Sequence, residues 1–188
     1  MSAKTLKRIR TALVAIAAIG LGSIARLEAA NPATLNLKVT VAPSLSIAVG
    51  TATYSFGSLA VNQTMLSTGA IPVTNDSAGR TEDLQITGAN SANWSISNST
   101  NGVDTFYLRA LLNTTAPTQA NFTAAFSTLS ATIANMSAAN YGGDQNGNDV
   151  ASGASKNLWF MLGTPTTTSS TSEQSISVTL TAADAGTF

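Results

Sequence analysis

The sequence predicts an all-β protein: a single antiparallel β-sandwich, immunoglobulin-like or jelly-roll-like, with one short helix. Short segments in which apolar and polar residues alternate recur along the chain. Gly, Asn, Asp, Ser and Pro separate these segments at short intervals. No internal repeat and no domain-length linker interrupts this pattern, so we expect one β domain over residues 43–188.

Residues 1–29 have the features of a cleaved secretory signal. Basic residues at positions 4, 7, 8 and 10 precede an uncharged apolar run over residues 11–25, and small residues follow it. Cleavage after Ala29 would make Ala30 the first residue of a secreted, extracellular or cell-surface protein. The rival is a prepilin-type leader, cut before the apolar run, but no glycine precedes Thr11 to serve as a processing site. The run is short for a membrane span, and we expect none in the mature chain.

The first element of the mature chain is a strand over residues 30–42. Its apolar residues occupy every second position, at Leu35, Leu37, Val39 and Val41. A strand at a free terminus can pair within its own sheet or complete the sheet of a neighbouring subunit. The second arrangement builds filaments when the rotation between subunits does not close. We predict strand exchange through these four residues, with Pro43 at the hinge because proline cannot donate to a strand ladder.

Later strands follow from the same alternation. We expect them over residues 45–49, 54–56, 71–73, 84–86 and 94–96. Residues 105–112 and 158–162 are apolar on both faces, which is typical of central strands. Residues 176–180 form the last strand, with Ile176, Val178 and Leu180 facing inward. The Thr/Ser-rich residues 164–172 are expected to be the hairpin tip that joins the last two strands.

The period changes to that of a helix after Pro117. Thr118 can cap a helix whose apolar side carries Phe122, Ala125, Phe126 and Leu129. A Gly/Asn/Asp-rich loop over residues 141–153 follows.

Composition argues against an enzyme. The chain has no His and no Cys, which excludes His-based triads, thiolate nucleophiles and disulfides. Glu82 and Asp83 are adjacent, so on a strand they face opposite sides and cannot share a substrate; we expect both to be solvated loop acids. Without the leader, four basic and eight acidic residues remain, a formal charge of −4. This charge gives no reason to expect a nucleic-acid partner.

One polar stretch could hold a metal ion. Oxygen-bearing side chains lie close together at Asp144, Asn146, Asn148 and Asp149, as they do in calcium-binding loops. The Asn146-Gly147 pair is also a strong turn signal. A plain turn and a structural calcium site therefore both remain open.

Seven Asn-X-Ser/Thr motifs are candidates for glycosylation, although a surface rich in Ser, Thr and Asn creates such motifs by composition alone. They are at Asn62, Asn75, Asn93, Asn98, Asn113, Asn121 and Asn135. Trp94 and Trp159 belong either to the core or to a sugar-stacking platform. Tyr141, beside the polar loop, is expected to be the most exposed ring.

Several motifs resemble those of surface proteins. After the leader and the alternating strand, Ser55-Phe56-Gly57 and Ile71-Pro72-Val73-Thr74-Asn75 resemble secreted pilin-type subunits of the spore-coat-U and archaic chaperone–usher kind, which exchange an amino-terminal strand. A likeness to WxL-type cell-surface β domains is carried by Phe56-Gly57, the Trp94-Ser95-Ile96-Ser97 strand and the closing segment from Leu158-Trp159-Phe160 through Val178-Thr179-Leu180-Thr181, which resemble theirs. Asn157-Leu158-Trp159-Phe160 with the Thr-rich segment after it is similar to secreted Thr/Ser-rich surface β-sandwich proteins.

These observations favour a structural subunit that polymerises with itself into an extracellular filament or surface coat. The alternative is a monomeric cell-envelope or glycan-binding module that uses Trp94 or Tyr141.

Overall fold

The computed structural model describes residues 36–39 and 44–186. The chain divides into two units, Met1–Val41 and Ala42–Phe188. In the first unit, residues 36–39 belong to no strand, and Leu37 and Val39 are 86% and 87% exposed. None of the helical segments in the described residues has the length and apolarity needed to span a lipid bilayer.

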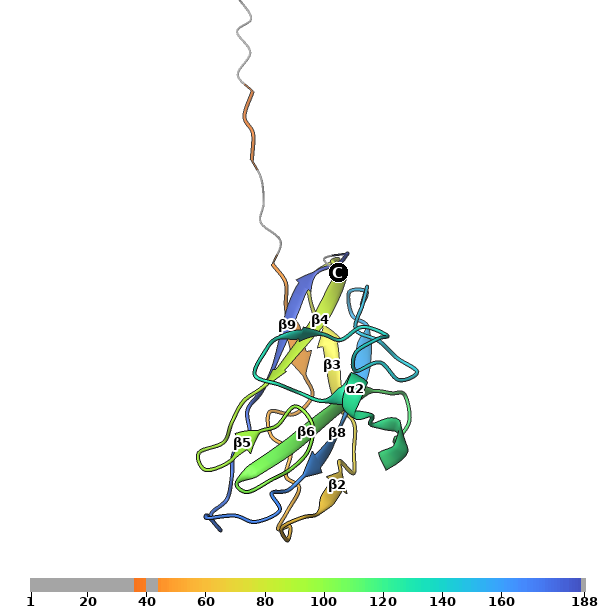
Figure 1. The fold of residues 1–188 in the computed structure, drawn as a ribbon. Coiled ribbons are helices and arrows are strands. Elements are labelled where there is room, and N and C mark those ends of the chain that lie inside the picture. Colours follow the sequence, from red (N-terminus) through yellow and green to blue (C-terminus); the bar gives the residue numbers. More distant parts are fainter. Residues whose placement is uncertain (1–35, 40–43, 187–188) are drawn as a thin grey trace, which may run out of the picture. The chain divides into compact units, whose positions relative to one another are not determined.

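The second unit is an all-β, sandwich-like structure of two sheets, as the sequence predicts (Figure 1). The larger sheet has the order β1 (Ile47–Val49), β3 (Ile71–Asn75), β8 (Ser155–Gly163), β6 (Thr105–Leu112) and β5 (Ser95–Ile96), and β2 (Thr64–Leu66) also pairs with β8. The smaller sheet has the order β7 (Ala134–Asn135), β4 (Glu82–Gly88) and β9 (Val178–Asp184). Neighbouring strands are antiparallel except for β5 and β6, which are parallel.

The two central strands are apolar on both faces, as predicted. Leu158, Phe160 and Leu162 of β8 point into the main core between the sheets. Trp159 and Met161 point the other way, into a second apolar cluster with Leu111 of β6 and Phe122. The strand predicted over residues 54–56 does not form. Instead Tyr54 and Phe56 make an edge-to-face ring pair with centroids 5.0 Å apart.

The expected hairpin between the last two strands is wrong. β8 lies in the larger sheet and β9 in the smaller one, so residues 164–177 cross from one sheet to the other. Two backbone contacts hold this crossover to the loop before β6: Thr166 N donates to the carbonyl of Gly102, and Asp104 N to that of Thr167. The Asp104 carboxylate also accepts the Ser169 N–H at 2.7 Å, and this hydrogen bond lowers the pKa of Asp104.

The single helix expected after Pro117 is also wrong. The segment contains a 3-10 turn, η1 (Gln119–Asn121), and one turn of α-helix, α2 (Ala124–Ser127), and the two residues between them are not helical. Phe122 packs in the second apolar cluster and Leu129 in the main core. One continuous helix cannot direct its apolar side into both clusters, so the helix is interrupted and Phe126 is left 56% exposed.

Candidate functional site

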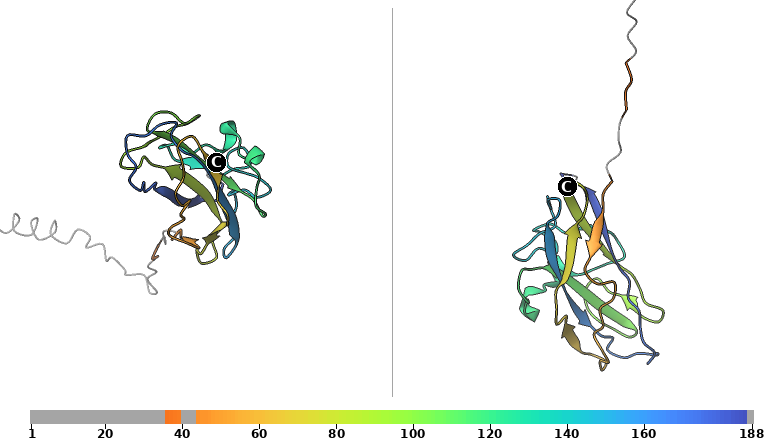
Figure 2. Two further views of the ribbon diagram at one scale, coloured as in Figure 1. Left: turned by 90° about the horizontal axis from the view of Figure 1, so that it is seen from below. Right: turned by 180° about the vertical axis from the view of Figure 1, so that it is seen from behind.

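The most distinctive feature of the β domain is the pair of edge strands β1 and β9. These strands lie side by side where the two sheets meet (Figure 1), as the view from behind also shows (Figure 2). Among the described residues, β1 pairs only with β3 and β9 only with β4. No strand ladder therefore joins the two sheets here, and we call this boundary the β1–β9 seam.

Apolar side chains at the seam are only partly covered. Along residues 174–182, half-buried and exposed residues alternate strictly, with Ile176, Val178, Leu180 and Ala182 among the half-buried ones. This confirms the predicted inward face of the last strand. Ile47 of β1 is likewise half-buried, whereas Val73 and Ile86 on the interior strands are fully buried. The core is thus less well covered at the seam than at its centre.

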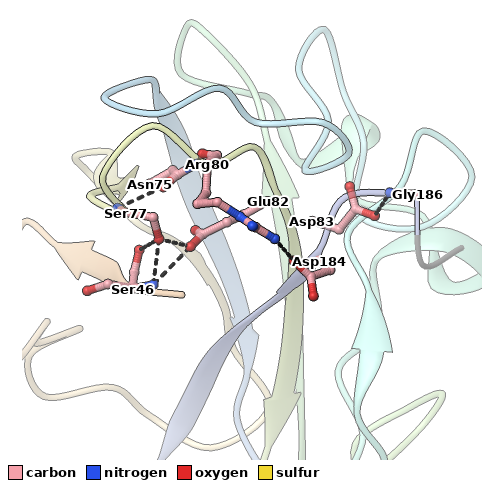
Figure 3. Close-up of polar contacts among 8 residues, drawn as sticks. All are labelled: Ser46, Asn75, Ser77, Arg80, Glu82, Asp83, Asp184 and Gly186. Atoms are coloured by element: carbon pink, nitrogen blue, oxygen red, sulfur yellow. Dashed lines mark hydrogen bonds and ion pairs between the residues drawn. The ribbon is translucent and has the colours of Figure 1, made fainter. Parts of the chain in front are cut away.

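A polar cluster holds the start of β1. The carboxylate oxygen Oε1 of Glu82 accepts the Ser46 N–H at 2.9 Å and the Ser77 hydroxyl (Figure 3). The Ser77 Oγ also lies 2.7 Å from the same Ser46 nitrogen. Because Ser46 immediately precedes β1, these bonds anchor the point at which the chain enters the β domain.

The residues at the end of β9 are held by Asp83, whose side chain is on the opposite face of β4 from that of Glu82, and by Arg80. Asp83 accepts the N–H of Gly186 at 3.0 Å and that of Asp149 at 2.7 Å. Arg80 forms an ion pair with Asp184 at 2.6 Å (Figure 3). The adjacent acids of β4 therefore point to opposite sides, as strand geometry requires, and each fixes a different part of the chain.

The expectation that Glu82 and Asp83 are solvated loop acids is wrong. Both are buried strand residues, at 0% and 1% exposure. Burying an acid is tolerated when hydrogen-bond donors are supplied, as the N–H groups and the Ser77 hydroxyl do here. One oxygen, Glu82 Oε2, has no partner among the described residues. The two carboxylates do not converge on a shared space, so this geometry supports an anchoring role.

Asn75 completes the cluster. Its side-chain nitrogen donates to the carbonyls of Arg80 and Val150, both at 2.7 Å, and its oxygen accepts the Ser77 N–H at 2.9 Å. From the sequence, Asn75 is predicted to belong to a turn and a glycosylation motif, and nothing in that prediction points to this role. The available signal was the proximity of Asn75 and Ser77 to two acids that open a strand with Leu84 and Ile86.

The predicted strand-exchange residues lie in the first unit. Leu37 and Val39 are the described members, and their high exposure leaves both side chains available for an apolar partner. Leu35 and Val41, like Pro43, lie outside the described residues.

The predicted calcium ligands make hydrogen bonds within the protein. Asp144 accepts the Thr114 N–H at 2.6 Å, and Asn146 accepts the Asn148 N–H at 3.1 Å. Asp149 uses its backbone N–H to bond Asp83, and Asn148 Oδ1 has no partner in the described part of the chain. Within residues 36–39 and 44–186, no group of three or more acidic side chains is placed to hold a metal ion.

The glycosylation candidates differ in accessibility. Asn75 is fully buried, so its amide is inaccessible to a glycosylating enzyme once the domain has folded. Asn113 and Asn135 are half-buried. The exposed candidates are Asn62, Asn93, Asn98 and Asn121.

Of the rings proposed for sugar stacking, Tyr141 and Trp159 are buried and Trp94 is half-buried. Tyr141, expected to be the most exposed ring, is 4% exposed, and its hydroxyl donates to the Thr128 carbonyl at 3.0 Å. Burial raises the pKa of this phenol. Trp159 is buried and donates to the Asn113 carbonyl. Trp94 packs near Phe106 and donates to the Thr168 hydroxyl.

Comparison with known protein families, curated proteins and solved structures found no significant match to this chain.

Proposed function

We propose that this protein is a secreted structural subunit of an extracellular filament or surface coat. In this proposal residues 1–29 are removed as a signal peptide, and residues 30–42 form a strand that completes a sheet of the neighbouring subunit. The partner is another copy of the same chain, and the role is structural, not catalytic.

The exposure of Leu37 and Val39 carries the proposal. Two large apolar side chains at alternate positions are 86% and 87% exposed, and the core of the β domain is built from other residues. Their spacing suits a strand that places one face against a sheet, and Leu35 and Val41 extend the same spacing. Such a segment gains stability by strand addition, in which backbone bonds provide affinity and alternate side chains are buried.

The aromatic residues do not favour the glycan-binding alternative. Tyr141 is buried, and the Trp94 ring packs near Phe106 while its nitrogen bonds Thr168. A stacking platform needs an exposed ring face, so we retain the structural role as the single proposal.

Replacing Leu37 and Val39 with Asp tests the assembly. Burial of two such side chains contributes about 3–6 kcal/mol, so we expect the double variant to associate at least ~100-fold more weakly. Electron microscopy and light scattering of the exported protein would measure this. The matched control places Asp at Asn36 and Thr40, the alternate face, and should assemble normally. Polymerisation of a variant that lacks residues 31–41 would refute the mechanism.

The export step has a separate test. Intact-mass measurement of the exported protein should give a chain that begins at or near Ala30. A mass that still includes residues 11–25 would reject cleavage of a signal peptide.

A further inference from the structure

We infer that β9 is the edge that accepts the exchanged strand, with residues 35–41 of a second copy lying along residues 176–182. This inference rests on the proposed function and adds to it the acceptor and the register.

β9 differs from every other edge strand in the described residues. β1, β2, β5 and β7 contain two or three residues each, whereas β9 contains seven. Proteins commonly protect a long edge with Lys, Pro or a bulge, because its unpaired backbone groups attract other strands. Residues 175–183 include no charged residue, Pro or Gly, and the only charged residue of β9 is Asp184 at its end. A long edge whose charge is confined to its last residue is suited to pairing with another chain.

The backbone of β9 presents bonding groups away from β4. Ala89 N donates to the Ser177 carbonyl, and the register places Thr179 opposite Thr87 and Thr181 opposite Gln85. In an antiparallel pair, bonded and non-bonded positions alternate. The N–H groups of Val178, Leu180 and Ala182 therefore face the seam, where no described strand pairs with them.

The side-chain spacing of the donor matches that of β9. Four partly buried residues of the acceptor, Ile176, Val178, Leu180 and Ala182, occupy every second position. Four apolar donor residues, at positions 35, 37, 39 and 41, have the same spacing. Aligning the two sets places Lys38 opposite Thr179 whether the strands run parallel or antiparallel. Both side chains then point to solvent, so the donor's charge stays outside the core.

The anchor at Ser46 limits how far apart two subunits can lie. Glu82 and Ser77 hold Ser46, so only the few residues between Val41 and Ser46 can connect the donor to its own domain. This connection spans at most ~17 Å when fully extended. We expect the gap between adjacent β domains to be no larger than about this distance.

Disulfide trapping tests the acceptor, and the absence of native cysteine makes it specific. We expect the Lys38→Cys/Thr179→Cys variant to form a ladder of covalently linked chains on a non-reducing gel. Lys38→Cys/Thr123→Cys, with its second cysteine at an exposed position between η1 and α2, should not. Asn36→Cys combined with either Thr181→Cys or Ser177→Cys then reports an antiparallel or a parallel donor, and linkage in either pair supports the β9 edge.

Filaments in which Lys38→Cys links to none of positions 177, 179 and 181 would overturn the inference and leave the proposed function standing. A disulfide confined to single chains would overturn both, because each molecule's own segment would then occupy the seam and would not be exchanged. If the wild-type protein forms no filament or coat at all, the proposed function fails instead.

Hydrogen exchange provides a second measurement. It uses the unmodified protein, so the misfolding of a variant cannot affect the result. On assembly, the amides of Val178, Leu180 and Ala182 should exchange at least 10-fold more slowly. The amides of Thr179 and Thr181, which already face β4, should change little. Equal exchange of all five amides in assembled and dissociated protein would overturn the inference.

Discussion

Replacing Asn75 with Ala should destabilise the β domain far more than replacing an Asn at an exposed glycosylation motif. The fully buried Asn75 side chain donates to two carbonyls and accepts one N–H. Each bond contributes about 1 kcal/mol, and each buried group left without a partner adds a further penalty. We therefore expect the variant to lose about 3–5 kcal/mol of unfolding free energy, a large fraction of the stability of a typical domain.

Urea unfolding of the exported protein, followed by tryptophan fluorescence, measures this loss. With a slope of about 2 kcal/mol/M, the midpoint should fall by about 1.5–2.5 M. Asn98→Ala is the matched control, because Asn98 is exposed and makes no side-chain hydrogen bond in the described part of the chain. We expect its change to stay within about 0.5 kcal/mol. If the unfolding free energies of the two variants differ by less than about 0.5 kcal/mol, the polar cluster does not stabilise the domain as argued.

Three further changes test other parts of the structure. In Gly163→Ala, the added Cβ would collide with the Tyr107 ring, so we expect the unfolding free energy to fall by about 1–3 kcal/mol. Gly69→Ala is the control, because the space around Gly69 is open and the variant should be nearly neutral in the same melt. Equal losses in the two variants would contradict the packing. Tyr141→Phe removes one hydrogen bond worth about 1 kcal/mol. In an alkaline absorbance titration, the variant should also lose the component of the tyrosine titration that lies above the ordinary pKa of about 10, because burial raises the pKa of Tyr141. A titration curve whose high-pH part is unchanged would contradict the burial. Because the folded-state pKa of Tyr141 is raised, its contribution to stability is present below the ordinary value and lost as pH rises above it, so the midpoint of the wild type should fall more steeply than that of the variant above pH ~10. Chelator and added calcium should leave the melting temperature unchanged, because Asp144 and Asn146 already accept hydrogen bonds within the protein; a rise with calcium would instead support a structural metal site.

Much of the fold could be predicted from local patterns. The segment apolar on both faces at Thr105–Leu112 is the central strand β6, with the predicted bounds. The alternation at residues 176–180 correctly predicted which side chains of β9, and of the residues just before it, face inward. These predictions succeeded because the side-chain period of a strand depends only on neighbouring residues and on which face is buried.

The site was less predictable. Tyr141 stands beside polar residues in the sequence, yet it is buried, because its N–H bonds the Phe126 carbonyl and its hydroxyl bonds Thr128. Glu82 and Asp83 resemble surface acids until residues 46, 149 and 186 supply their donors. No local pattern identifies partners so distant along the chain.

Residue order alone was enough to predict short strands, the lack of the His and Cys found in common catalytic sites, and the alternation of apolar residues before Pro43. The assignment of β8 and β9 to different sheets, which makes β9 a long edge beside β1, came from the folded arrangement. Alternation specifies which face of a strand is buried but not which strand lies beside it. Pairing is selected by long-range packing and hydrogen bonding, and these contacts leave β9 with one side unpaired among the described residues.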